Sequence, residues 1–445
     1  MVALPPEVHG SSLSQTLRWA FRPLPFMDEC RRRYGDAFGL RFLGFERPMY
    51  LLSDPAAIKA LYQERSHGLP PGRNIILEPI LGSKSLLIQE GAEHLSRRKL
   101  MLPPFHGERM RSYEGVVDEI VGAEIDSWPL RREFPIHTRM QAITLEVILR
   151  VVFGVADGPR LERLRGMLAN VLQETASPRA QIIGLATRRF GGKGPWAKFE
   201  GALREVDDLL YAEIAEHRER PGLEEREDVL SMLMVAEFED GGTMSDTELR
   251  DQLMTLLLAG HETTATGLAW TFDLLLRHPR ALARLREELA AGEDEYLRAT
   301  ISESLRLRPV IPLAGRRLST ELVADGLTLP AGTDVTPAIW LTHTRADVYP
   351  EPYAFKPERF LDGNGPDTYG WLPFGGGIRR CIGASFAEFE MRIVLREVLT
   401  RCDLRKADPA PEKTGRRNIT LSPKDGTPVI VTARRPAREP ALAAA

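Results

Sequence analysis

The sequence predicts a mainly α-helical protein with a small β region. From about residue 90 to 290, apolar residues recur at i, i+3 and i+4, as in LEVILRVVFG and LERLRGMLANVLQE, which is the period of an amphipathic helix. Residues 37–54 and 309–343 instead combine short β-type runs with turn residues such as Asp325-Gly326, which is typical of strands. We therefore expect many helices and a few short strands.

Length and composition define the class of protein. The chain has 445 residues, 43% of them hydrophobic, so it can bury a large core, and its length alone suggests two or three domains. A net charge of -3 with mixed signs does not indicate a nucleic-acid partner. Three cysteines without CxxC spacing argue against a disulfide framework and a structural zinc site, and they favour a reducing, cytoplasmic location. The N-terminus lacks an apolar stretch of membrane-spanning length, so we expect no membrane anchor.

Several short elements follow from local patterns. Residues 24–36 predict an amphipathic helix, residues 37–54 a β-hairpin and residues 427–433 a last strand. Residues 1–20 and 434–445 carry few structural signals, so we expect both ends to be loosely ordered.

Two segments, residues 64–90 and 175–196, mix Gly and Pro with apolar residues and predict irregular loops. The second contains GGKGPW, which invites comparison with a phosphate-binding loop. However, Gly194 follows Lys193 where Ser or Thr should hold magnesium, and Thr187 replaces the upstream glycine. We therefore exclude a phosphate loop.

Residues 251–276, DQLMTLLLAGHETTATGLAWTFDLLL, are apolar on nearly all sides and predict a buried helix. At about 1.5 Å per residue this helix is roughly 40 Å long, enough to cross a domain. Its middle, AGHETT, contains a glycine and two threonines. Such residues favour a local kink, which makes room for a ligand and water.

The stretch LPFGGGIRRCIGASFAEFE, residues 372–390, places Cys381 between a glycine run and a predicted helix. The glycines give the loop conformational freedom, and the helix N-terminus favours a thiolate. Phe374 can shield the sulfur, and the neighbouring arginines can neutralise carboxylates of a ligand. An inert buried cysteine and a catalytic nucleophile are the alternatives, although no nearby histidine in the sequence suggests a base.

The pattern Phe374-Gly375-x-Gly377-x-Arg379-x-Cys381-x-Gly383 resembles the haem-binding signature of the cytochrome P450 superfamily. The resemblance implies haem b as cofactor, with Cys381 as the axial thiolate ligand of its iron. Arg379 stands where many bacterial members carry histidine, and either residue can reach a haem propionate.

Three further segments occur in the order that this family shows, and the first of them contains Glu303. Glu303-Ser304-Leu305-Arg306 can form an i, i+3 pair, and with Arg359 of PERF it resembles the family's ExxR motif and its second arginine. Such a glutamate between two arginines implies a salt bridge that fixes the cysteine loop.

The AGHET segment resembles the family's acid–alcohol pair. The resemblance implies that Ala259 lies at the haem, and that Glu262 and Thr263 deliver protons to bound dioxygen. His261 points elsewhere on the helix, so we expect it to be structural.

A third segment carries His94 and Arg98, which share a helix face at i, i+4 and resemble the family's HxxxR pair for haem propionates. Arg316 occupies a similar role in the family, but Arg317 beside it leaves the register open between the two.

The likeness covers about residues 30–432 and implies one P450 domain over residues 1–445, in which the haem lies between the long central helix and the helix after Cys381. It implies a monooxygenase that inserts one atom of O2 into a hydrophobic small molecule such as a fatty acid, terpenoid or steroid. Electrons would come from a ferredoxin or flavodoxin with an NAD(P)H-dependent reductase, drawn to basic residues near the cysteine: Arg97, Lys99, Arg109, Arg111 and Arg380.

The substrate pocket of such an enzyme would be lined by aliphatic residues, which suggests a hydrophobic substrate. The expected wall consists of Ile75, Leu77, Leu258, Val310, Ile311, Leu313 and Ile419. The alternatives are a peroxide-driven peroxygenase and a non-catalytic haem-binding sensor. The pair Glu262-Thr263 argues against both, because neither function requires proton delivery to dioxygen.

Overall fold

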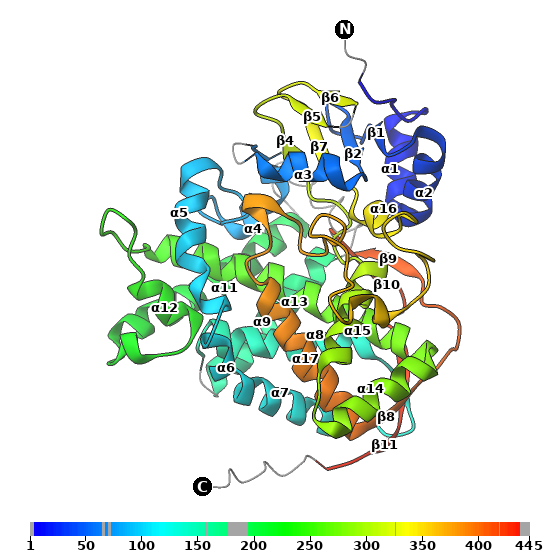
Figure 1. Ribbon diagram of the computed structural model, residues 1–445. Helices are drawn as coiled ribbons and strands as arrows, with labels where there is room; N and C mark the ends of the chain where they lie inside the picture. The colour runs from blue at the N-terminus through cyan, green and yellow to red at the C-terminus, as the bar shows by residue number, and fades with distance from the viewer. Residues whose placement is uncertain are drawn as a thin grey trace.

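A computed structural model describes residues 4–64, 67–69, 73–155, 158–176, 195–324, 326–417 and 419–436; for residues 73–76, 160, 170–176, 195 and 196 it describes only the backbone. Most of the predicted loop at 175–196, including GGKGPW, lies outside these residues, as does Asp325. Within the described chain the structure is mainly helical with small sheets, as the sequence predicts (Figure 1).

Helix α13, Asp246–Arg277, runs through the middle of the molecule (Figure 1). A capping box between Ser245 and Glu248 starts it, and Pro279 follows its end. The predicted buried helix is therefore confirmed. It packs against α8 Ile136–Val147, α11 Pro195–Glu219, α15 Glu295–Leu307 and α17 Ala384–Arg401.

The helices around this centre share one large hydrophobic core, to which α7, α8, α13 and α17 contribute. Further helices are α1 Ser12–Phe21, α2 Pro23–Tyr34, α3 Pro55–Gln63, α4 Arg73–Leu81, α5 Gly91–Met101, α6 Arg109–Ser112, α7 Glu114–Ser127, α9 Pro159–Ala176, α12 Val229–Val235, α14 Pro279–Ala291 and α16 Ile339–His343. Short turns are η1 Pro103–Phe105, η2 Ile148–Val152, η3 Leu223–Glu225, η4 Pro357–Phe360 and η5 Gly377–Arg379. In the part of the chain that is described, no helix combines the length and the apolar character needed to cross a bilayer.

In the residues that are described, the strands form four small sheets, and the largest lies at one end of the molecule beside α1 and α2 (Figure 1). Its order is β1 Ala37–Leu40, β2 Met49–Leu52, β7 Asp334–Pro337 and β4 Arg316–Arg317. Strands β1 and β2 are the predicted hairpin, and β7 pairs with β2 in parallel. The others are the three-stranded sheet β3 Glu133–Pro135, β11 Pro428–Arg434, β8 Cys402–Lys406, and the hairpins β5 Leu322–Ala324 with β6 Leu327–Leu329 and β9 Thr414–Arg417 with β10 Thr420–Pro423.

Residues 4–20 differ from our expectation of loose order. Gly39 on β1 donates to the carbonyl of Pro6 and accepts from the N–H of Val8, both at 2.9 Å. The Ser11 side chain then caps α1. Pairing with a sheet edge and a capped helix fix this segment, and neither is visible in the composition on which we based the expectation. At the other end, Arg435 still donates to the carbonyl of Arg401 at 2.7 Å.

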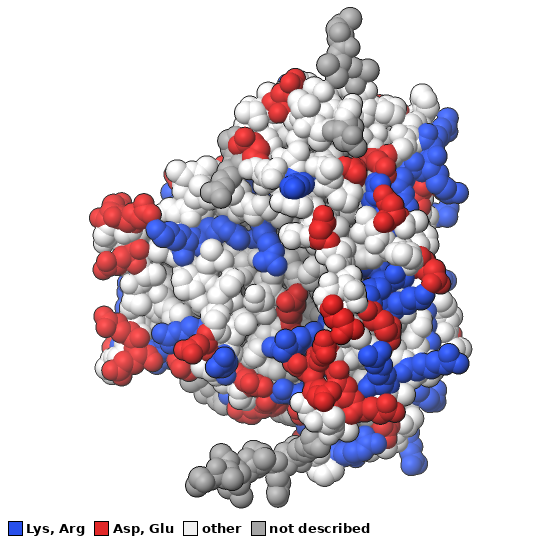
Figure 2. All heavy atoms as spheres, in the orientation of Figure 1, with Lys and Arg blue, Asp and Glu red and all other residues white. Residues whose placement is uncertain are grey.

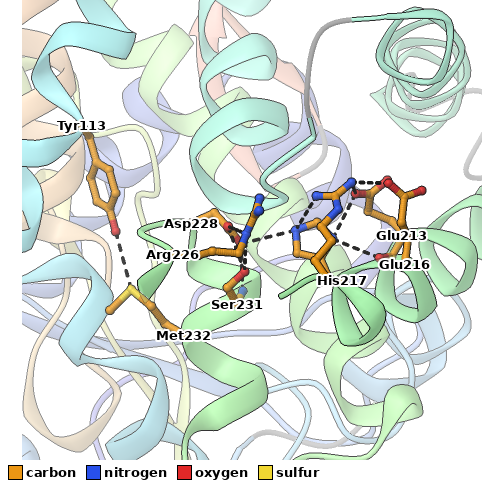
Figure 3. Close-up of polar contacts among 9 residues, drawn as sticks. Tyr113, Glu213, Glu216, His217, Arg226, Asp228, Ser231 and Met232 are labelled. Atoms are coloured by element: carbon orange, nitrogen blue, oxygen red, sulfur yellow. Dashed lines mark hydrogen bonds and ion pairs between the residues drawn. The ribbon is translucent and has the colours of Figure 1, made fainter. Parts of the chain in front are cut away.

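A cluster of buried polar side chains lies between α11 and α12 (Figure 3). His217 near the end of α11 is fully buried, with Nδ1 3.0 Å from Glu213 and Nε2 3.6 Å from Asp228. The Asp228 side chain also accepts from the N–H of Ser231 and so caps the start of α12. Gly154 has φ +65°, and a Cβ there would lie 2.5 Å from the Asp228 carboxyl carbon. The cluster therefore joins α11, α12 and the turn after η2.

Candidate functional site

The loop before Cys381 is shaped by its glycines. Gly375 and Gly377 have φ values of +66° and +65°, which side chains strongly disfavour. A Cβ on Gly376 would lie 2.5 Å from the ring of Tyr62 on α3, so this ring packs directly on the loop backbone. The N–H of Cys381 donates to the carbonyl of Phe374 at 3.0 Å. The glycine run therefore allows a tight turn that presents the cysteine.

The Cys381 thiol is solvent-accessible, and yet burial raises its pKa. A thiol with both properties lies in a recess enclosed by protein rather than on the outer surface. The N–H of Gly383 and the charges of Arg380 and Arg98 act against burial and favour the thiolate. Helix α17 begins directly afterwards at Ala384, as predicted. These neighbours make Cys381 a candidate metal ligand.

A cluster of positive charge adjoins this recess, and it brings together four residues that the sequence singled out. His94 and Arg98 come from α5, Arg316 from β4 and Arg379 from η5. Burial, followed by the charges of Arg379, Arg98 and Arg316, lowers the pKa of His94 to about 4. Its Nδ1 is buried without a hydrogen-bond partner.

The structure also decides between the two neighbouring arginines. Arg316 is buried, and within the described chain it donates to backbone carbonyls, including those of Gly315 at 2.9 Å and Gly376 at 3.3 Å. Arg317 forms a bidentate pair with Asp334 at 2.7 and 2.8 Å. Alternation along β4 sends the two side chains to opposite faces, and only Arg316 joins the cluster.

The Glu303–Arg306 pair forms as predicted and is fully buried. Two hydrogen bonds of 2.6 and 2.8 Å join the side chains. Arg359 lies 3.5 Å from the same carboxylate, and the N–H of Lys356 donates to it at 2.8 Å. The pair therefore ties α15 to the segment around η4.

His343 is a residue that the sequence reasoning missed. It is buried, and burial followed by the charge of Arg306 lowers its pKa to about 3. Its Nε2 accepts from the N–H of Leu372 at 2.7 Å, while its Nδ1 lies 3.1 Å from the carbonyl of Arg306. This neutral ring connects the Glu303–Arg306 pair to the start of the cysteine loop. No motif marks it, because its role depends on a contact 29 residues away.

Most of helix α13 is buried, but a short stretch in its middle is partly exposed. Ala259 is exposed, and Leu258, Gly260, Glu262 and Thr263 are half-buried, whereas the turns on either side are buried. The Thr263 hydroxyl donates to the carbonyl of Ala259 at 2.5 Å. Helix α13 therefore presents a short open stretch at the predicted position.

The two polar neighbours at this stretch differ in their surroundings. Glu262 is bound by Gln141, whose Nε2 donates to it at 2.6 Å, and burial raises its pKa. His261 is buried, and burial lowers its pKa to about 4. Its backbone carbonyl accepts from the Thr144 hydroxyl at 3.0 Å.

The expected pocket wall is only partly open. Leu77, Leu258 and Ile311 are half-buried and Ile419 is exposed. Val310 instead packs in the main core and Leu313 against the core near β1 and α2. The side chain of Ile75 lies outside the described residues.

The residues present fit haem, the cofactor that the resemblance implies. Among the residues that the structure describes, no carboxylate influences the pKa of Arg98 or Arg316, and none offers a hydrogen-bond partner to the His94 Nδ1. Buried positive charge without an anion is costly, so the cluster suits the two carboxylates of a haem. The glycine loop, the recessed thiol and the open stretch of α13 supply the other surfaces that such a group needs.

Comparison with known proteins agrees with this geometry. Residues 15–429 match the family described as Cytochrome P450. The putative cytochrome P450 135B1 of Mycobacterium tuberculosis is 42% identical over 442 residues, which cover 98% of this chain and 92% of that protein. The putative cytochrome P450 137 of the same species is 40% identical, over 92% of this chain and 84% of that protein.

Solved structures show the same fold. The retinoic acid-bound cyanobacterial CYP120A1 superposes with a TM-score of 0.82 at 25% identity, over 97% of this chain and 100% of that one. The haem domain of cytochrome P450DA superposes with a TM-score of 0.81 at 23% identity, over 98% and 99% of the two chains.

Proposed function

Because the chain belongs to the cytochrome P450 family, and is therefore a haem b monooxygenase, we propose that Cys381 is the axial thiolate ligand of its haem iron. The observation that carries this proposal is the recessed Cys381 thiol beside the cluster of buried His94, half-buried Arg98 and buried Arg316. Among the described residues, no carboxylate influences the pKa of either arginine. When bound through a thiolate, the haem supplies the activation of O2. The chain holds the group, excludes water and moves protons.

The cluster binds the haem propionates. His94, Arg98, Arg316 and Arg379 come from three separate elements, so binding of two carboxylates between them also joins those elements. Arginine suits this task because its guanidinium stays charged when buried and can donate two parallel hydrogen bonds. The Glu303–Arg306 pair, with Arg359, supports the site indirectly. It fixes His343 and, through it, the loop that carries Cys381.

Glu262 and Thr263, in the open stretch of α13, would handle protons for the O2 chemistry that a bound haem supplies. The Thr263 hydroxyl lies in the open stretch of α13 and can rotate from the Ala259 carbonyl to a ligand. Glu262 is half-buried, and burial raises its pKa, which favours a proton-transfer role over that of a permanently charged carboxylate. The two side chains would pass protons from water toward the reacting oxygen.

The substrate is a hydrophobic small molecule of the fatty acid, terpenoid or steroid type. Its binding wall includes Leu77, Leu258, Ile311 and Ile419, whose aliphatic side chains offer no strong polar partner. The solved relative CYP120A1 contains retinoic acid, an apolar molecule with one carboxylate, which supports a ligand of this class.

Electrons come from a separate ferredoxin or flavodoxin with its NAD(P)H-dependent reductase. Lys99, Arg109, Arg111 and Arg380 are exposed, and Figure 2 shows a band of Lys and Arg side chains over α5 and the segment that leads into α17. Arg97 does not contribute to this surface, because it is buried and paired with Glu248. An acidic partner would fit the band.

Carbon monoxide difference spectroscopy tests the assignment of Cys381. The reduced, haem-loaded protein should give the strongly red-shifted Soret band of thiolate ligation. The Cys381→Ser variant should lose this band, with Cys402→Ser as the matched control that keeps it. A red-shifted band that survives in Cys381→Ser would contradict the proposal.

The propionate cluster has its own test. Apoprotein titrated with haem dimethyl ester, which lacks free carboxylates, should bind at least about tenfold more weakly than with haem, since each charge-assisted hydrogen bond contributes about 1.5–3 kcal/mol. In Arg98→Gln and Arg316→Gln the difference between the two ligands should shrink. Equal affinities of the wild-type protein for both ligands would reject the cluster as the propionate site.

A further inference from the structure

Five large apolar side chains are exposed at the end of the molecule that carries α1 and the β1–β2 turn (Figure 1). Helix α1 contributes Leu13, Leu17 and Phe21, which follow one another four residues apart and therefore lie along one helix face. Leu43 and Phe45 lie in the turn between β1 and β2. Phe21 exposes 78% of its surface and Leu43 59%. A group of large apolar side chains left in water marks a binding surface, and we call these five residues the α1 surface.

Contacts between α1 and the turn hold the two parts of this surface side by side. The N–H of Leu43 donates to the Thr16 hydroxyl on α1 at 2.8 Å, and the rings of Trp19 and Phe42 lie 6.1 Å apart. Trp19 and Phe42 are half-buried and pack against the core near β1 and α2. The N–H of Phe45 donates to the carbonyl of Phe42 at 3.1 Å and closes the turn. Leu43 and Phe45 are thus fixed beside α1 but remain outside the core.

Positive charge borders the α1 surface. Arg22 ends α1, and Arg47 lies in the connection between β1 and β2. Arg33 lies in the last turn of α2, which packs against α1. All three arginines are exposed, and none of them forms an ion pair with another residue that the structure describes. Figure 2 shows Lys and Arg side chains gathered over α1 and α2.

The acidic residues nearby leave this charge unbalanced. Residues 1–50 contain seven arginines and five acidic residues, although the whole chain has a net charge of -3. Three of the acidic side chains are already paired: Glu7 with Arg41, Glu29 with Arg18 and Asp36 with Arg345. Asp28 accepts a hydrogen bond from the Trp340 indole, and Glu46 is the fifth. A partner that compensates the three unpaired arginines is therefore negatively charged.

An anionic phospholipid membrane matches both properties of this surface. Leu and Phe side chains on one face of a helix enter the boundary between headgroups and acyl chains, while neighbouring arginines bind the phosphates. A second copy of the chain matches less well. A two-fold symmetric interface pairs the same patch on both copies, so it would bring Arg22, Arg33 and Arg47 of one copy close to those of the other, and opposed like charges are costly.

We propose that the α1 surface, together with Arg22, Arg33 and Arg47, binds peripherally to the anionic headgroup region of a phospholipid membrane. The inference is independent of the proposed haem site, because none of these residues belongs to it. The basic band over α5 that we assign to the redox partner lies apart from α1 (Figure 2). Membrane binding through α1 therefore leaves that band free.

Vesicle flotation with the holoprotein tests the proposal. The protein should float with vesicles of phosphatidylcholine and phosphatidylglycerol at low salt, bind more weakly to phosphatidylcholine alone, and lose affinity as salt screens the arginines. Leu17→Ser and Phe21→Ser should each lower the affinity for the anionic vesicles by about tenfold or more, because each removes an apolar side chain that the membrane would bury. Leu130→Ser is the matched control, since Leu130 is as exposed as Leu17 but lies beside β11, at the opposite end of the molecule (Figure 1).

The arginines have a separate test. The double variant Arg22→Gln/Arg47→Gln should lower the affinity for the anionic vesicles by at least about tenfold, and it should leave the affinity for phosphatidylcholine vesicles close to wild type. Arg109→Gln/Arg111→Gln removes charge from the surface assigned to the redox partner, and it should change neither affinity.

A fluorescent side chain tests the orientation on the membrane. In Phe21→Trp the added indole should enter the membrane, so phospholipids brominated in their acyl chains should quench the fluorescence that it adds. Leu130→Trp, at the opposite end of the molecule, should show no such quenching. Circular dichroism and the carbon monoxide spectrum establish that each variant is folded and loaded with haem.

The outcomes decide between the possible occupants. Flotation that depends on Leu17, Phe21 and the arginines supports the proposal. A wild-type holoprotein that does not float with the anionic vesicles at low salt, or that floats equally well after Leu17→Ser and Phe21→Ser, overturns it. A dimer in sedimentation velocity that dissociates in Phe21→Ser would assign the α1 surface to a second copy of the chain and would also overturn the proposal.

Discussion

At the scale of single residues, Glu303 shows how much a buried charge depends on its partners. Its carboxylate receives two hydrogen bonds from Arg306 and one from the N–H of Lys356, and neither Glu303 nor Arg306 is exposed. A buried ion pair contributes little compared with an apolar pair, but removal of one partner leaves an uncompensated charge.

We predict that Glu303→Ala destabilises the protein by about 3–5 kcal/mol or prevents haem loading, because it leaves Arg306 buried without its carboxylate. Denaturant unfolding and the haem absorbance ratio measure the effect. Glu351→Ala is the control, since Glu351 forms an exposed pair with Lys356 and should change stability by less than about 1 kcal/mol. A normal holoprotein with Glu303→Ala would show that the pair does not support the cysteine loop.

Thr263 differs from the other threonines of α13 in that it lies in the open stretch of the helix. We predict that Thr263→Ala keeps haem and substrate binding but diverts electrons to hydrogen peroxide, because the hydroxyl that would pass protons toward the reacting oxygen is lost. The ratio of peroxide to NAD(P)H consumed is the measurement. Thr263→Ser keeps the hydroxyl and should remain close to wild type; an unchanged ratio in Thr263→Ala would reject the assigned role.

At the scale of elements, the cluster around His217 makes the junction of α11 and α12 sensitive to pH (Figure 3). Burial alone would lower the pKa of His217, but the hydrogen bonds and charges of Asp228 and Glu213 outweigh it and raise this pKa to about 9. Burial would raise the pKa of Asp228, but His217 and Ser231 lower it to about 2.

The sign of each shift defines a pH window. A histidine with a raised pKa stabilises the fold fully below its unfolded value of about 6.5 and loses this contribution as pH rises to about 9. An aspartate with a lowered pKa contributes above its unfolded value of about 3.9, and this contribution is lost as pH falls to about 2. The interaction is therefore complete between about pH 4 and 6.5.

We predict that His217→Gln lowers the free energy of unfolding by on the order of 2–3 kcal/mol at about pH 6, and that the difference from wild type disappears toward pH 9. Urea titrations across this range provide the measurement. The exposed His106 is the control, and His106→Gln should give a small difference without this dependence. A constant difference for His217→Gln across the range would contradict the raised pKa.

At the scale of the whole molecule, charge is distributed unevenly although the net charge is only -3. Figure 2 shows the basic band over α5 and the cysteine loop, while acidic groups gather elsewhere on the same face. Such a band steers an acidic partner before contact, and salt screens the effect.

We predict that the second-order rate of reduction by an acidic ferredoxin falls steeply as ionic strength rises. The double variant Arg109→Gln/Arg111→Gln should lower this rate severalfold at low salt and approach wild type at high salt. Arg22→Gln, an exposed change at the end of α1, should have no effect. Stopped-flow reduction kinetics decide the matter, and a rate that is independent of salt would contradict electrostatic docking on this band.

Much of the site was predictable because its chemistry depends on spacing along the chain. The i, i+3 pair Glu303–Arg306, the i, i+4 pair His94–Arg98 and the glycines around Cys381 all act within one helix face or one loop, and helical geometry brings such residues together wherever the helix packs. The apolar run of α13 likewise indicates burial without any knowledge of its neighbours.

Other features depend on contacts between residues far apart in sequence. His343 meets Leu372, Tyr62 meets Gly376, and Gln141 and Arg417 meet Glu262, and in each case the partners come from different elements. The order of the N-terminal residues depends on pairing with Gly39. Even the choice of Arg316 over Arg317 required the strand pairing with β7, since only the face of the strand separates two adjacent arginines.

The sequence by itself determined the fold class, the cysteine loop and the motifs that indicate a haem-thiolate monooxygenase, because local periodicity and fixed spacings carry that information. Only the tertiary structure decided which charges compensate one another. Within the described part of the chain, no carboxylate acts on the pKa of Arg98 beside Cys381 or of Arg316, whereas Glu262 has a cation from β9, Arg417. Burial makes an uncompensated charge costly, and burial is a property of the packed molecule rather than of any segment of its sequence.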